Sequence, residues 1–134
     1  MTPNKAFDQY KENSIYTASP EELTLMLYNG IIKFIMQAQA AIDEKNVERT
    51  HTSITRAEDI ITELQTTLDI NYEVANNLTL LYDYMARRLI EGNVKKDKSI
   101  LEEVLGLVKE LRDAWSQAIK IARQQQGRTQ QIAK

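Results

Sequence analysis

The stretch Ser19-Pro20-Glu21-Glu22, followed by LTLMLYNGIIKFIMQAQAAID at 23–43, decides the fold of this chain. Serine is a favoured N-cap, proline is tolerated at the first helical position, and a glutamate three residues after the cap completes a capping box. The following residues include one glycine and no proline. They therefore predict a long helix from residue 20 to about residue 43 or 44, where Glu44-Lys45-Asn46 indicates a polar turn.

Three further segments repeat their apolar residues at the spacing of a helix. The second helix is predicted over 47–68, and the third over 72–91, with Gly92 as its C-terminal stop. A polar turn at 93–98 then leads to a fourth helix, whose apolar stripe runs over 100–122. Each of these helices has one apolar face to bury.

Amphipathic helices joined by short turns can bury their stripes only against one another, and short connections make neighbours antiparallel. The predicted fold is therefore all-α, an antiparallel up-down four-helix bundle over residues 19–123. Residues 1–18 are expected to form a helical or extended cap segment. The polar ending, 124–134, is expected to be disordered.

Composition excludes several classes of protein. The 134 residues carry 17 basic and 19 acidic side chains, so one domain with a formal charge of −2 has no positive field for nucleic acid. Cysteine is absent, which removes disulfides and thiolate sites. Residues 1–13 lack the apolar run of a signal peptide, and no stretch approaches the ~20 apolar residues of a membrane span. A cytoplasmic protein without membrane insertion is expected.

The sequence gives little support to an active site, a metal or another cofactor. Glu48-x-x-His51 has the spacing of the carboxylate–histidine pairs of di-iron bundles, but such a site needs a second histidine and His51 is alone. No nucleophile motif or phosphate-binding glycine loop occurs. Arg87-Arg88 and Lys95-Lys96 are most simply solubilising charge. An enzyme is not expected.

The first long helix is more apolar than one buried face requires. Its apolar arc covers roughly 200°, whereas a surface helix needs about 100°. Residues 1–18, which we call the leader, can cover the extra apolar surface of this helix with their own apolar side chains. Alternatively, another protein supplies an apolar segment that binds there. Both hold if the leader is displaced when that segment binds. The predicted partner-binding residues are Leu25, Tyr28, Ile32, Leu80 and Tyr84 in the grooves, with Phe7, Tyr10 and Ile15 in the leader.

A series of short motifs is distributed along the whole predicted bundle. They are Tyr10 with Asn13 and Ile15, Thr17-Ala18-Ser19-Pro20-Glu21-Glu22-Leu23, Leu27-Tyr28-Asn29-Gly30, Arg56-Ala57, Ile60-Ile61-x-Glu63-Leu64, Leu81-Tyr82-Asp83-Tyr84-Met85, Arg87-Arg88-Leu89, Glu91-x-Asn93, Glu103-Val104 and Arg112-Asp113-Ala114-Trp115. In the order and spacing of these motifs, the chain up to about Ile119 resembles the FliS family of flagellar secretion chaperones.

The resemblance implies a helical bundle that binds the disordered C-terminal segment of flagellin, prevents early polymerisation and aids delivery to the flagellar type III export apparatus. It also implies the export gate and, in some members of the family, an anti-sigma factor as further partners. The alternative from another class is a four-helix scaffolding or signalling module that binds a folded protein. The sequence leaves open whether the free chain is a monomer or a weak homodimer.

Overall fold

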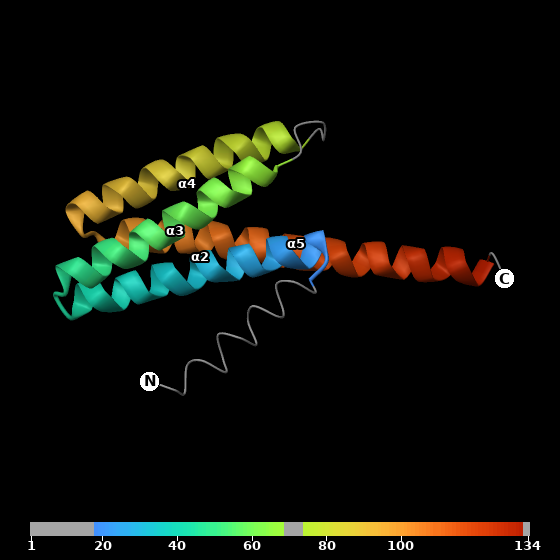
Figure 1. Ribbon diagram of the computed structural model, residues 1–134, viewed down its shortest axis with the longest axis horizontal. Helices are drawn as coiled ribbons and strands as arrows, with labels where there is room; N and C mark the ends of the chain where they lie inside the picture. Colours follow the sequence, from blue (N-terminus) through green and yellow to red (C-terminus); the bar gives the residue numbers. More distant parts are fainter. Residues whose placement is uncertain (1–17, 69–73, 133–134) are drawn as a thin grey trace.

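The computed structural model describes residues 18–68 and 74–132, which form the helices α2 (Pro20–Asp43), α3 (Val47–Thr67), α4 (Ala75–Lys95) and α5 (Lys98–Ile132) (Figure 1). This part of the chain contains no strand. None of these helices combines the length and the apolar content needed to cross a bilayer. The leader residues Phe7, Tyr10 and Ile15 lie outside the described residues.

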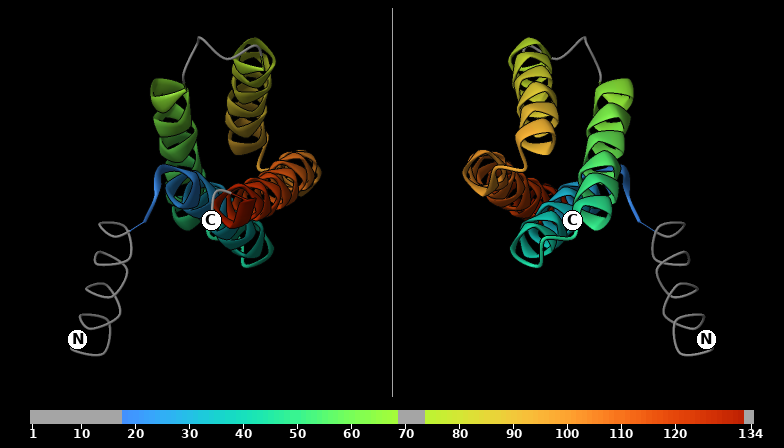
Figure 2. Two further views of the ribbon diagram at one scale, coloured as in Figure 1. Left: turned by 90° about the vertical axis from the view of Figure 1, so that its right-hand side faces the viewer. Right: turned by 90° about the vertical axis from the view of Figure 1, so that its left-hand side faces the viewer.

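The helices run alternately in opposite directions, as short connections require (Figure 1). Helix α2 packs against α3 and α5, and α4 packs against the same two helices from the other side. Viewed along the bundle, α3 and α4 stand next to each other while α2 and α5 cross beside them (Figure 2). The predicted all-α helical bundle is confirmed.

The start of α2 follows the predicted capping chemistry. The Ser19 Oγ accepts a hydrogen bond from the Glu22 backbone N–H at 3.2 Å, and Pro20 occupies the first helical position. Asn46 caps α3 in the same way, because its Oδ1 accepts from the Arg49 N–H at 3.0 Å. Both helix starts therefore satisfy amides that would otherwise lack partners.

Two helix ends differ from the sequence prediction. Helix α4 continues past Gly92 to Lys95, and Lys96 supplies the left-handed C-cap with φ 52°. Gly92 is buried against the start of α5, where a Cβ would lie 3.0 Å from Leu101 Cδ2 and 3.2 Å from Ile100 Cγ2. This glycine therefore allows close packing and does not end the helix.

Helix α5 is the other difference, since it continues to Ile132 instead of ending near residue 123. Its last turns are rich in Gln and Arg, which favour helix over coil. The segment 124–134, expected to be disordered, is thus helical as far as Ile132 and projects beyond the other three helices (Figure 1).

The core explains most of the broad apolar arc of α2. Tyr28, Ile32 and Ile35 are buried together with Ile31, because α3 and α5 cover two different faces of the same helix. A helix with two neighbours needs a wider apolar surface than a helix with one. The surplus inferred from the sequence is therefore largely used inside the chain, and what remains is confined to a pocket and a few exposed side chains.

Candidate functional site

An open cavity of about 480 Å³ lies at the end of the bundle where α2 begins, α3 ends and α4 begins. We call it the end pocket. Apolar side chains dominate its walls, and none of the described residues that line it is basic. They are Pro20, Glu21, Thr24 and Tyr28 from α2, Leu64, Thr67 and Leu68 from the end of α3, Val74, Ala75, Leu78 and Tyr82 from the start of α4, and Trp115 from α5.

Two of the lining residues, Tyr28 and Tyr82, are paired through their hydroxyl groups. The Tyr28 and Tyr82 hydroxyl oxygens are 2.6 Å apart and share a hydrogen bond, and each side chain is only 2% exposed. Burial raises the pKa of both phenols, and the hydrogen bond between them adds to the rise at Tyr82. Both groups are therefore neutral at physiological pH, because loss of a proton would bury a charge.

The rim of the end pocket is held by contacts between α2 and α5. The Trp115 Nε1–H donates to the backbone carbonyl of Glu21, in the first turn of α2, at 2.9 Å. Arg123 forms an ion pair with Glu22 at 2.6 Å, further along the projecting part of α5. Both groups of the ion pair are well exposed, so it contributes little energy, but together the two contacts fix the position of the indole beside the pocket.

The structure does not gather the predicted groove residues into one groove. Tyr28 lines the end pocket, whereas Ile32 is 7% exposed and belongs to the core, and Leu25 is half-buried outside the pocket. Leu80 is 68% exposed but lies about 200° around α4 from the pocket residue Leu78. Whether these residues contact a partner stays a prediction.

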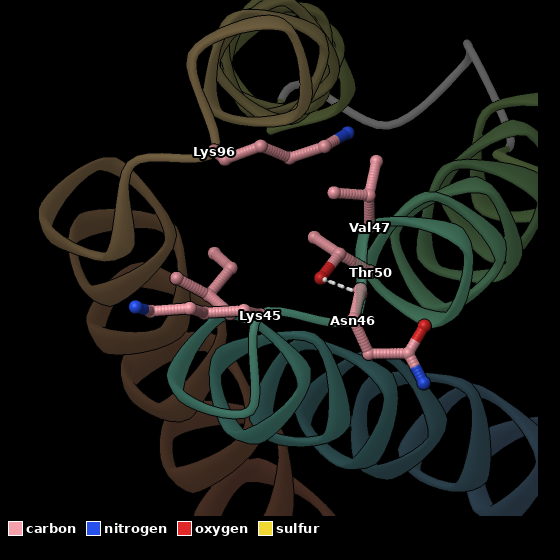
Figure 3. A pocket seen from close by; sticks show the side chains of 6 residues that line it. Lys45, Asn46, Val47, Thr50 and Lys96 are labelled. Atoms are coloured by element: carbon pink, nitrogen blue, oxygen red, sulfur yellow. Dashed lines mark hydrogen bonds between the residues drawn. The ribbon is translucent and has the colours of Figure 1, made fainter.

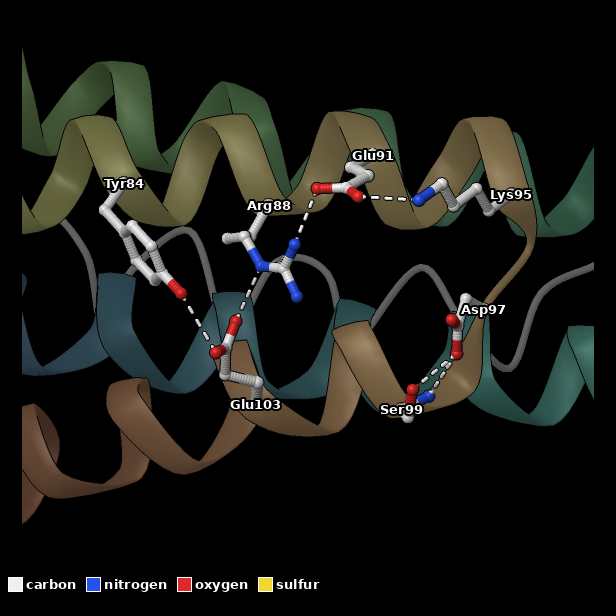
Figure 4. A network of polar contacts seen from close by, with 7 residues as sticks. All are labelled: Tyr84, Arg88, Glu91, Lys95, Asp97, Ser99 and Glu103. Atoms are coloured by element: carbon white, nitrogen blue, oxygen red, sulfur yellow. Dashed lines mark hydrogen bonds and ion pairs between the residues drawn. The ribbon is translucent and has the colours of Figure 1, made fainter.

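Tyr84, the fifth predicted groove residue, belongs to a polar network between α4 and α5 (Figure 4). Its hydroxyl donates to Glu103 Oε2 at 2.9 Å, and the Arg88 Nε–H donates to Glu103 Oε1 at 2.8 Å. Arg88 also pairs with Glu91 at 2.6 Å, which in turn pairs with Lys95 at 2.8 Å. The hydrogen bonds from Arg88 and Tyr84 lower the pKa of Glu103, so this carboxylate stays ionised and holds Tyr84 against α5.

Most of the end pocket was missed by sequence reasoning. Thr24, Leu64, Leu78 and Trp115 were assigned no role or a role in the core, since each falls on or near an ordinary apolar stripe. The sequence feature that could have predicted the pocket is the position of its apolar residues, most of which lie near the ends of consecutive predicted helices. Such residues meet at one end of an antiparallel bundle.

A smaller cavity of about 220 Å³ lies at the opposite end of the bundle, beside the turn between α2 and α3 (Figure 3). The stems of Lys45 and Lys96 flank it, and Thr50 donates to the Asn46 carbonyl at 2.8 Å on one wall. His51 lies on the exposed side of α3, where its Nδ1 is 2.8 Å from the Asn93 amide nitrogen. Over 18–68 and 74–132, no three His, Cys, Asp or Glu side chains gather as metal ligands would.

Residues 3–122 match the family model described as "Flagellar protein FliS". The chain belongs to the FliS family. It is 46% identical over 123 residues to the flagellar secretion chaperone FliS of Bacillus subtilis (strain 168), covering 92% of each chain. It is 32% identical to the protein of the same name from Escherichia coli (strain K12), over 81% of this chain and 82% of that relative. The Salmonella typhimurium protein is 35% identical over 84% of this chain and 87% of its own length.

Family membership confirms the resemblance found in the sequence and supports a flagellar secretion chaperone as the function of this FliS-family chain. The match to the FliS model includes every residue that lines the end pocket, from Pro20 to Trp115. It ends at residue 122, so the last turns of α5 lie beyond it. The end pocket is thus part of the region shared with the family.

Proposed function

We propose that this chain is a cytoplasmic, non-enzymatic export chaperone that binds the disordered C-terminal segment of flagellin. Binding would keep flagellin subunits from polymerising early and aid their delivery to the flagellar type III export apparatus. The observation that carries the proposal is the end pocket, an open and mostly apolar cavity of about 480 Å³ at one end of the bundle.

The chemistry of the pocket suits an amphipathic segment that folds as it binds. Its walls are apolar, its volume accommodates more than one large side chain, and it opens between the ends of three helices. An amphipathic helix presents apolar anchors at intervals of three and four residues, which is the usual mode of docking in such grooves. One or two of these anchors would enter the end pocket.

A disordered client needs more contact than one pocket supplies, because ordering costs several kcal/mol and such interfaces bury on the order of 1,000 Å² or more. Exposed apolar side chains outside the pocket offer that contact. Three of these exposed side chains lie on α4. One is Leu80, which was also predicted as a groove residue, and the others are Ile90 and Val94. We propose Leu25, Leu80 and Tyr84 as secondary contacts, with the leader residues Phe7, Tyr10 and Ile15 covering or extending the site. The export gate and an anti-sigma factor remain predicted partners.

Calorimetric titration with a peptide of the flagellin C-terminal segment tests the proposal. We expect saturable binding, a negative heat-capacity change from apolar burial and a gain of helix by circular dichroism. A peptide of the same composition in scrambled order is the control, and it should not bind. Absence of binding to the flagellin peptide would contradict the proposal, and binding to an intact folded partner alone would favour a scaffolding module instead.

A further inference from the structure

Tyr28 and Tyr82, whose hydroxyls are paired, both line the mostly apolar end pocket. We infer that this pair selects a client segment that carries a neutral side-chain oxygen, from Ser, Thr, Asn or Gln, among its apolar anchors. The inference rests on the proposed function and adds to it the chemistry by which the end pocket distinguishes one apolar segment from another.

The donor follows from counting protons. Two hydroxyl groups carry two protons, but a hydrogen bond between them uses only one. In the part of the chain that the structure describes, the 2.6 Å contact between the two oxygens is the only hydrogen bond that either hydroxyl makes. One O–H therefore has no acceptor from residues 18–68 and 74–132. Both tyrosines are among the residues that line the cavity, so a side chain that enters it would come close to the pair and could accept from this O–H.

The acceptor has to be neutral because of the charges around it. Among residues 18–68 and 74–132, no lysine or arginine lines the end pocket, and the one charged residue at its wall, Glu21, is acidic. A carboxylate placed beside the tyrosines would lose its water without gaining a cation. The raised pKa values of both phenols keep the pair in its donating form throughout the physiological range. A neutral oxygen thus fits, whereas an acidic side chain is disfavoured.

The acceptor is assigned to a side chain of the client because a helical segment uses most of its backbone carbonyls internally. An apolar pocket alone discriminates weakly, since it accepts many side chains of similar size. A buried donor changes this, because a segment without an acceptor leaves the donor unpaired after water is expelled. The tyrosine pair would therefore fix which residue of the client faces the pocket, and so its register along the groove.

The test combines the variants Tyr28→Phe, Tyr82→Phe and the double variant with a set of flagellin C-terminal peptides. In each peptide one Ser or Thr is replaced by Ala or Val, or one Asn or Gln by Leu. For the wild-type chain, one replacement should lower the affinity about tenfold, which is the effect of one hydrogen bond of about 1.4 kcal/mol. The double variant should bind the unaltered peptide about tenfold more weakly, and should no longer distinguish it from that altered peptide.

Each single variant retains one hydroxyl that can donate to the client, so its affinity should stay within about threefold of wild type. Thr55→Val is the control, because it removes a side-chain hydroxyl and its hydrogen bond to the His51 carbonyl on α3, outside the end pocket and the proposed contacts. It should leave the ranking of the peptides unchanged. Loss of packing alone would weaken all peptides equally, whereas the proposed contact shows coupling between one peptide position and the tyrosines.

Equal affinity of the wild-type chain for every altered peptide would overturn the inference, and that result needs no variant to fold. A folded double variant that ranks the peptides as wild type does would overturn it as well. If the wild-type chain binds no flagellin peptide at all, the proposed function fails together with the inference. If the wild-type chain binds the flagellin peptides but does not distinguish between them, the inference fails and the proposed function stands.

Discussion

Replacing Leu78 by aspartate is expected to lower the affinity for the flagellin C-terminal segment about a hundredfold. Leu78 is half-buried and lines the end pocket from α4. The substitution removes an apolar contact and obliges the bound segment to bury an unpaired carboxylate or to leave it hydrated, and a cost of about 2.7 kcal/mol corresponds to a hundredfold change. Calorimetric titration measures the effect directly.

Leu80→Asp provides the matched control, since it makes the same change two residues along the same helix. Leu80 is largely exposed and lies on the other side of α4. If it is a secondary contact, its substitution should lower the affinity only several-fold, less than the change at Leu78. Unaltered affinity of a folded Leu78→Asp variant would contradict the placement of the client in the end pocket.

Replacing Gly92 by valine is expected to lower the free energy of unfolding by about 2–4 kcal/mol, as overpacking of a close helix contact does. A Cβ at this position already meets Leu101 and Ile100, and valine adds two methyl groups to that contact. Gly92→Ala should be milder, because the gain of about 1 kcal/mol in helix propensity offsets part of the strain. Urea denaturation followed by circular dichroism gives both values.

Gly106→Ala is the control for this stability effect. A Cβ at Gly106 would meet no neighbouring heavy atom within 4 Å, so the substitution should stabilise α5 by about 0.5–1 kcal/mol. If the Gly92→Val variant were as stable as the wild type, α4 and α5 would not be packed as closely as in the structure.

Sequence reasoning recovered the helices because their signals are local. The cap at Ser19 and the periodic stripes depend on residues within a few turns, and α2 and α3 end within a residue of their expected positions. It failed at Gly92, since the same residue serves as a helix stop or as a site of close packing. Only the position of Ile100 and Leu101 in space decides between these roles.

The candidate site was less predictable for a related reason. Tyr28 and Ile32 were predicted to be surplus apolar surface on the first helix, but both are buried, because α3 and α5 both pack on α2. The end pocket exists because the ends of α2, α3 and α4 do not close fully over the tyrosine pair. That gap is a property of how the helices are arranged, which periodicity does not specify.

Trp115 allows the most direct test of the central claim, because it is the only tryptophan of the chain and lines the end pocket. Its indole N–H, hydrogen-bonded to the Glu21 carbonyl, gives a single cross-peak in a ¹⁵N-correlated NMR spectrum. Titration with an unlabelled flagellin C-terminal peptide is expected to shift this peak and to saturate at the stoichiometry measured by calorimetry. Saturable binding that leaves the indole signal unmoved would place the client elsewhere and contradict the account.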